Sequence, residues 1–124
     1  MSVPDYQSLM LPLLRFAAEK KDETTTGEAA EVLAKELGLT DEDLKEMLPS
    51  GISSTFVNRV GWAATYMKKA GLLEATRRGY FRIASRGQEL LKKQPKVINV
   101  KLLKQYPEFL EFQQLKGTRS GAKG

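Results

Sequence analysis

The most restrictive feature of the sequence is an abrupt change of hydrophobic period at Gly71. Over residues 53–70 apolar side chains recur at helical spacing, whereas over residues 72–84 they alternate with polar ones. Glycine commonly ends a helix, because the residue after the last turn often takes a left-handed conformation. The sequence therefore predicts a long amphipathic helix that leads directly into a β-hairpin.

The predicted helix has two faces of different character. At about 100° per residue, one face is apolar and the opposite face is polar except for a tryptophan. The apolar face collects Phe56, Val60, Ala63, Met67 and Ala70. The opposite face collects Asn58, Trp62, Thr65 and Lys69. We expect the first face to pack in a core and the second to be available to a partner.

The hairpin is predicted to be half-buried and to carry a basic tip. Leu73 and Ala75 on the first strand, and Phe81 and Ile83 on the second, are the expected inward residues. The turn between them, over residues 76–79, contains two arginines and a glycine. Its charge would therefore face solvent or a polyanion.

Helices are predicted before the long helix. Apolar residues recur at helical spacing over residues 5–19 and over residues 29–37. Thr25 and Glu28 have the form of a capping box for the second of these helices, and Gly38 is expected to end it.

Helices are predicted again after the hairpin. Ser85 and Gln88 have the form of a helix cap, which opens a helix that runs toward a proline. The apolar and basic stretch over residues 97–115 is predicted to be helical on either side of Tyr106-Pro107.

This order of elements indicates the fold class. In a winged helix-turn-helix, one helix is offered to the major groove of DNA and the following hairpin reaches the flanking backbone. We therefore predict a mainly α fold with a small β-hairpin, a winged helix-turn-helix with additional C-terminal helices. The domain should span residues 3–115, and residues 116–124 should form a disordered tail or linker.

Composition excludes several classes of chemistry. The 124 residues contain no cysteine and no histidine, which removes disulfides, thiol nucleophiles, imidazole bases and the usual zinc ligands. No apolar run approaches the roughly 20 residues needed to span a bilayer, and the N-terminus lacks a basic segment followed by an apolar stretch and a cleavage site. We expect a cytoplasmic protein with no membrane partner, no metal, no cofactor and no catalytic residue.

The acidic residues need a separate test, because carboxylates can hold Mg²⁺. A short acidic helix is predicted over residues 40–48, and its Asp43-Leu44-Lys45, read together with Pro4-Asp5, matches a nuclease motif letter by letter. Catalytic carboxylates must converge beside the metal on a rigid framework, whereas these groups fall at the starts of separate helices. We interpret the match as coincidence.

Charge is distributed unevenly along the chain. Residues 1–51 hold 5 Lys and Arg against 11 Asp and Glu, whereas residues 52–124 hold 15 against 4. The net charges of the two parts are thus −6 and +11, within an overall +5. The later part is suited to a polyanionic partner such as nucleic acid.

Several stretches resemble the N-terminal domain of Mrr-type restriction endonucleases. They are VPDYQSLMLPLLRFA at 3–17, NRVGWA at 58–63, YMKKAGL at 66–72, RGY at 78–80 and RG at 86–87. The likeness covers roughly residues 3–112. It implies a winged-helix DNA-recognition module, joined in complete members to a PD-(D/E)xK nuclease domain that cuts modified, typically methylated, DNA. That nuclease domain lies outside these 124 residues, so we expect DNA binding without cleavage.

The residues predicted to contact double-stranded DNA lie at the start of the long helix and on the hairpin. Short polar and basic side chains near a helix N-terminus can reach base edges, and exposed arginines suit phosphates. The candidates are Ser54, Thr55, Asn58, Arg59, Trp62, Arg77, Arg78, Tyr80, Arg82 and Arg86. For Trp62, packing under the C-terminal helices and a subunit contact remain alternatives to stacking on DNA.

A second hypothesis is a winged helix that mediates protein interaction or dimerisation without direct DNA contact. Its support is the apolar C-terminal run that contains Phe109, Leu110 and Phe112. These side chains would form a homo-oligomer contact or dock the nuclease domain of a full-length protein.

Overall fold

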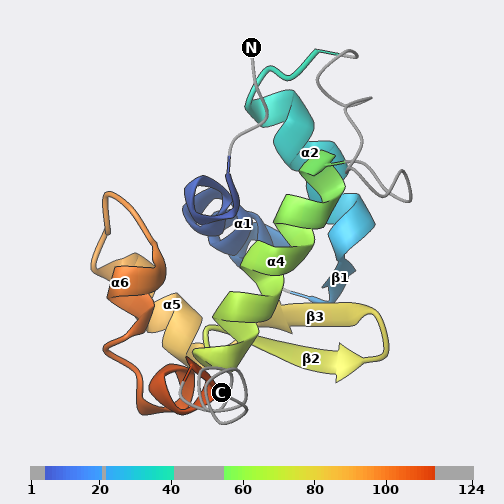
Figure 1. The fold of residues 1–124 in the computed structure, drawn as a ribbon. Helices are drawn as coiled ribbons and strands as arrows, with labels where there is room; N and C mark the ends of the chain where they lie inside the picture. The colour runs from blue at the N-terminus through green and yellow to red at the C-terminus, as the bar shows by residue number, and fades with distance from the viewer. Residues whose placement is uncertain (1–4, 21, 41–54, 114–124) are drawn as a thin grey trace, which may run out of the picture.

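The computed structural model describes residues 5–20, 22–40 and 55–113. Its elements are α1 (Tyr6–Lys20), β1 (Thr24–Thr25), α2 (Thr26–Glu36), α4 (Thr55–Lys69), β2 (Leu73–Arg77), β3 (Tyr80–Ile83), α5 (Ser85–Lys92) and α6 (Val100–Leu103), with further helix at 107–113 (Figure 1). The predicted fold class, mainly α with a small antiparallel sheet, is confirmed. Apart from Thr40, the predicted acidic helix and its Asp43-Leu44-Lys45 lie outside the described residues, as do Pro4, Ser54 and the predicted tail.

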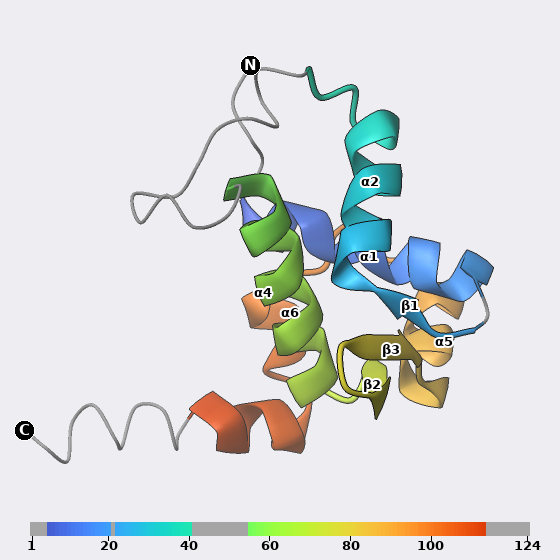
Figure 2. The same cartoon turned by 90° about the vertical axis from the view of Figure 1, so that its right-hand side faces the viewer.

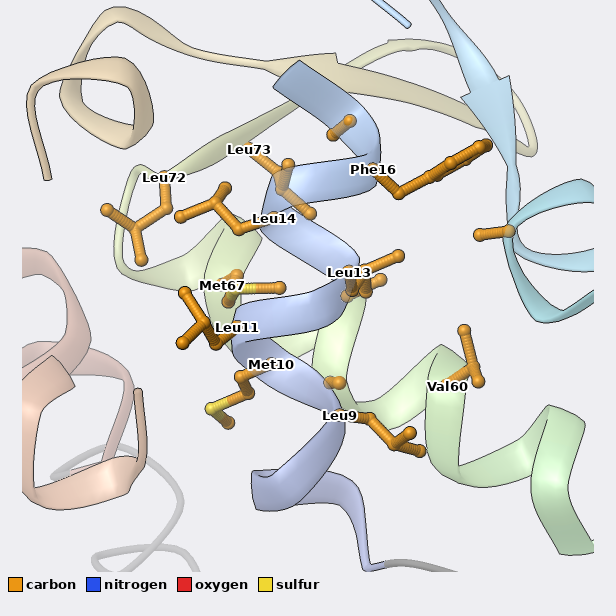
Figure 3. Packing of buried hydrophobic residues seen from close by; sticks show 14 of the residues in the cluster. Leu9, Met10, Leu11, Leu13, Leu14, Phe16, Val60, Met67, Leu72 and Leu73 are labelled. Carbon is orange, nitrogen blue, oxygen red and sulfur yellow. The ribbon is translucent and has the colours of Figure 1, made fainter. Parts of the chain in front are cut away.

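Helix α1 forms the centre of the core. Apolar residues occur on more than one side of it, so α4, β3 and α5 all pack against it. Its buried residues are Leu9, Met10, Leu11, Leu13, Leu14, Phe16 and Ala17. Figure 3 shows six of these side chains, from Leu9 to Phe16, in one cluster with Val60 and Met67 of α4 and with Leu72 and Leu73 at the start of the hairpin.

The two faces of α4 divide as the sequence predicts. All five residues of the expected apolar face, from Phe56 to Ala70, have no exposed surface. The helix ends at Gly71, which takes a φ of +84°, and the Leu72 N–H donates to the Met67 carbonyl at 2.9 Å. This pattern is a Schellman motif, which only a residue tolerant of positive φ forms without strain. Gly38 ends α2 in the same way, with a φ of +69°.

The sheet has three antiparallel strands in the order β1-β3-β2. The hairpin was predicted, but β1 was not, because two threonines carry no alternation to detect. Thr24 pairs with Phe81, so β3 becomes the central strand. Phe81 and Ile83 are buried as expected, whereas Ala75 is exposed. The prediction for Ala75 was wrong because β2 is an edge strand whose outer part extends beyond the helices, with its turn pointing away from α5 and α6 (Figure 1).

The helix caps agree with the sequence only in part. The Thr25 hydroxyl accepts a hydrogen bond from the Glu28 N–H at 3.1 Å, as a capping box requires. The Glu28 carboxylate does not reach back to Thr25, however, because it binds Lys20 at 2.7 Å and the Thr24 hydroxyl at 2.6 Å. The predicted cap at Ser85 was wrong: Ala84 is the N-cap residue of α5 and supplies no side-chain hydrogen bond.

The C-terminal segment returns to the core instead of leaving it. Ile98, Leu103 and Phe109 are fully buried, and the Val100 N–H donates to the Gln7 side-chain oxygen of α1 at 2.9 Å. Figure 2 shows the last described helix beside the lower end of α4. The apolar residues after α5 are therefore largely part of this chain's own core.

Aromatic rings pack the helix at 107–113 against α4. Tyr66 of α4 has its ring centroid 5.7 Å from Phe109, 5.8 Å from Phe112 and 5.1 Å from Tyr6 of α1. Because Phe109 is buried and Phe112 is half-buried, they offer little surface to a second copy. Leu110, at 41% exposed, remains as a predicted contact of a homo-oligomer.

Candidate nucleic-acid interface

The outward face of α4 presents the tryptophan together with polar groups. Trp62 is 46% exposed, Lys69 is exposed, and Asn58 and Thr65 are half-buried. The Trp62 ring meets Tyr66 edge-on at 6.1 Å, so its position is set by the aromatic cluster below it. This face offers a large flat ring flanked by an amide and an ammonium group.

The start of α4 is less available than the sequence indicates. Thr55 is only 4% exposed, so its side chain has almost no surface to present to DNA. Arg59 is half-buried and lies near the beginning of α1. A hydrogen bond from the Ser8 backbone N–H lowers the pKa of Asp5, and the positive charge of Arg59 lowers it further. Arg59 is therefore close to a carboxylate and is not centred on the polar face of α4.

On the hairpin, two of the predicted arginines are already paired. The Arg77 Nε donates to Glu23 at 3.1 Å, and its guanidinium stacks on the Tyr80 ring with the carbon 3.9 Å from the ring centroid. Arg82 pairs with Glu74 at 2.5 Å, directly across the β2–β3 ladder. The positive charge of the hairpin is thus partly neutralised by neighbouring carboxylates.

Arg78 differs from these two arginines. It is exposed at the turn beside Gly79, which takes a φ of +81°. It forms no hydrogen bond, ion pair or ring contact with any residue of the described part of the chain. Its guanidinium is therefore available to an external anion, whereas those of Arg77 and Arg82 are paired within the described fold.

Arg86 is used inside the fold. Its Nη1 donates to the Ala70 carbonyl and to Glu108, both at 2.8 Å, and its Nη2 donates to the second oxygen of Glu108 at 3.2 Å. The guanidinium carbon also lies 4.8 Å from the Tyr106 ring centroid. The hydrogen bonds with Glu108 raise the pKa of Arg86 and lower the pKa of Glu108. Arg86 ties the end of α4 to the C-terminal segment, which argues against its predicted role as a DNA contact.

A groove between α4 and β2 contains two lysines that were not among the predicted DNA contacts, although Lys69 was expected on the polar face of the helix. It has a volume of about 510 Å³ and is lined by Thr65, Lys68, Lys69, Leu73, Glu74 and Ala75. The Lys68 ammonium lies 5.2 Å from the Phe81 ring centroid, and that of Lys69 lies 5.4 Å from Phe112. Lysines in a last helical turn are common because they complement the helix dipole, so their residue type and position alone do not mark them as DNA contacts.

Metal-binding and membrane-spanning features are absent from residues 5–20, 22–40 and 55–113. Within these ranges, no three acidic side chains gather as a metal site would require. None of the described helices has the length and apolar character needed to cross a membrane.

Comparison with known proteins gives one family and one curated relative. Residues 6–93 match the Mrr N-terminal domain. The type IV methyl-directed restriction enzyme EcoKMrr of Escherichia coli (strain K12) is 32% identical over 95 residues, which are 77% of this chain and 31% of the relative. The chain thus spans about a third of the length of that enzyme, and no solved structure gives a significant match. The match over most of the described fold confirms the resemblance: the chain belongs to the Mrr N-terminal domain family.

Proposed function

We propose that the chain binds double-stranded DNA, and that it is the recognition part of a restriction system directed to methylated DNA. Membership of the family and similarity to a methyl-directed restriction enzyme support a restriction role. The arrangement of α4 and the hairpin supports contact with a duplex, because a helix and a projecting hairpin can engage a groove and its flanking backbone together.

The observation that carries this proposal is the set of cations along α4 and the hairpin. Lys68 and Lys69 line one groove with β2, and Arg78 extends from the turn of the same hairpin. Lysine and arginine side chains of this kind bind phosphates and hold a protein in register on DNA. In this arrangement Asn58 and Trp62, on the outward face of α4, lie nearer the bases than the three cations do. The Asn58 amide can then pair with adenine, and the Trp62 ring can stack on a base.

The first prediction is a moderate salt dependence of DNA binding. If Lys68, Lys69 and Arg78 each neutralise one phosphate, log K should fall against log salt with a slope of about −2.7, from about −0.9 per contact. Fluorescence anisotropy with labelled duplexes, methylated and unmethylated, measures this slope. Absence of binding at low salt, or affinity independent of salt, would remove the DNA proposal.

A matched pair of lysine variants locates the interface within the same experiment. Lys69→Ala should make the slope less steep by about 1 and weaken all duplexes alike, as expected for a phosphate contact. Lys35→Ala removes the same charge from the exposed last turn of α2, outside the groove, and should leave the slope unchanged. Equal effects of the two variants would show that only net charge matters.

The second prediction is that the chain binds DNA without cutting it. Phosphodiester hydrolysis by metal-activated water requires carboxylates that fix an ion beside the scissile phosphate. No such cluster of carboxylates occurs among the described residues. We therefore expect supercoiled plasmid, methylated or unmethylated, to stay intact when it is incubated with the protein and Mg²⁺ or Mn²⁺. Asp43→Ala and Lys45→Ala variants serve as controls, since nicking that either variant abolishes would make the chain an enzyme.

A further inference from the structure

The hairpin contains two donors that converge on one anionic oxygen. The Thr76 hydroxyl donates to Oε1 of Glu23 at 2.9 Å, and the Arg77 Nε donates to the same atom at 3.1 Å. A hydroxyl and a guanidinium directed at a single oxygen are also the groups that proteins use to hold a phosphate oxygen. In this conformation a carboxylate of the chain itself occupies that position.

The guanidinium of this pair is already oriented. It stacks on the Tyr80 ring at 3.9 Å, and Tyr80 lies opposite Arg77 in the β2–β3 ladder. A stacked planar group has less conformational freedom to lose when a ligand arrives. Tyr80 therefore orients the guanidinium independently of its contact with Glu23.

The carboxylate comes from a distant part of the sequence and is easily displaced. Glu23 precedes β1 and lies 54 residues before Arg77. The side chain of Arg77 is 62% exposed and that of Glu23 is 30% exposed, so solvent and a ligand can reach the pair. Ion pairs this exposed contribute little to stability, and exchange of the carboxylate for another anion costs little.

The second ion pair of the hairpin lacks these properties. Glu74 and Arg82 are direct neighbours across the β2–β3 ladder, as opposite charges on paired strands commonly are. No second donor joins Arg82 at the Glu74 carboxylate within the described residues. The Glu74–Arg82 pair therefore needs no role other than stabilising the sheet. The Glu23–Arg77 pair, in contrast, joins residues that are far apart in the sequence.

We propose that Thr76 and Arg77 form a phosphodiester site that Glu23 occupies in the free protein, so that this carboxylate competes with DNA phosphate and lowers the affinity. The inference rests on the proposed DNA binding, and it names the backbone contact of the hairpin. Binding exchanges one anion for another at the same two donors. Arg77 is then available to DNA although it is paired in the free chain.

The test compares two variants that each remove one negative charge. Glu23→Gln should raise duplex affinity by up to about fivefold, the limit set by the strength of an exposed ion pair. Glu31→Gln, on an exposed position of α2, is the matched control and should change affinity much less. In an Arg77→Ala background the gain from Glu23→Gln should disappear, because the carboxylate acts through that guanidinium. An equal gain in both variants, or a gain that persists without Arg77, overturns the inference.

A second measurement separates this inference from the DNA proposal. Inorganic phosphate is titrated into ¹⁵N-labelled protein, and the Arg77 Nε–H and Thr76 amide signals are followed by NMR. They should shift at lower phosphate concentration in Glu23→Gln than in the unmodified chain. Phosphate shifts without duplex binding would reject DNA as the ligand and retain the anion site. Duplex binding with no effect of Glu23→Gln and no phosphate shifts would reject the anion site and retain DNA binding.

Discussion

Replacing Gly87 with alanine should lower the free energy of unfolding by about 3 kcal/mol, the upper range for an overpacked core. A Cβ at this position in α5 would lie 2.3 Å from the Leu72 carbonyl oxygen, 2.9 Å from Ile83 Cγ1 and 3.1 Å from Leu14 Cδ1. Alanine favours a helix over glycine by about 1 kcal/mol, which is too little to offset contacts this short. Urea unfolding followed by circular dichroism measures the change.

Gly61 provides the control for this substitution. It lies inside α4, and a Cβ there would meet only Thr26 Cγ2 at 3.7 Å, an ordinary contact distance. Gly61→Ala should therefore be neutral or stabilising by up to about 1 kcal/mol. Similar stability of the two variants would show that α5 does not pack as closely on the start of the hairpin as the structure indicates.

Replacing Phe109 with alanine should also be severely destabilising, by about 3–5 kcal/mol. The ring is fully buried and lies 5.7 Å from Tyr66 and 5.9 Å from Phe112, so its removal leaves a cavity between α4 and the last helix. Thermal and urea unfolding report the loss. The result would also show that the folded unit extends past residue 93, where the family match ends.

Leu110 is the matched control for Phe109. It is the next residue of the same helix and is 41% exposed, so Leu110→Ala should change stability by no more than about 0.5 kcal/mol. Equal effects of the two substitutions would mean that the C-terminal helix is not docked on α4 in solution.

The sequence predicted the parts of the fold that local signals define. The apolar stripe of α4, the stop at Gly71 and the presence of the following hairpin were confirmed, whereas the expected alternation failed on β2, where Ala75 is exposed. The strand β1 was missed because its two threonines become a strand only by pairing with β3, more than 50 residues later. Pairing with a distant strand does not produce a hydrophobic period within β1 that sequence analysis could detect.

The candidate site was less predictable for the same reason. Arginine side chains were selected by residue type and position, but their availability depends on distant carboxylates. Glu23 reaches Arg77 across 54 residues, and Glu108 reaches Arg86 across 22. Neither of these carboxylate partners can be identified from the sequence alone. Lys68 and Lys69 were not predicted as DNA contacts, because the groove that they line exists only where β2 packs beside the end of α4.

The close packing of α4 against its neighbours has a consequence for the shape of a bound partner. The helix is held by α1 on one side and by Phe109 and Phe112 on another, so it cannot tilt without opening the core. The hairpin follows α4 directly through Gly71, which fixes the angle between them. A duplex bound to both surfaces, as proposed above, would therefore have to deform to fit them. Bending DNA costs least at flexible pyrimidine–purine steps, so under the proposed DNA binding this protein would favour sequences that deform easily, including at base pairs that it never touches.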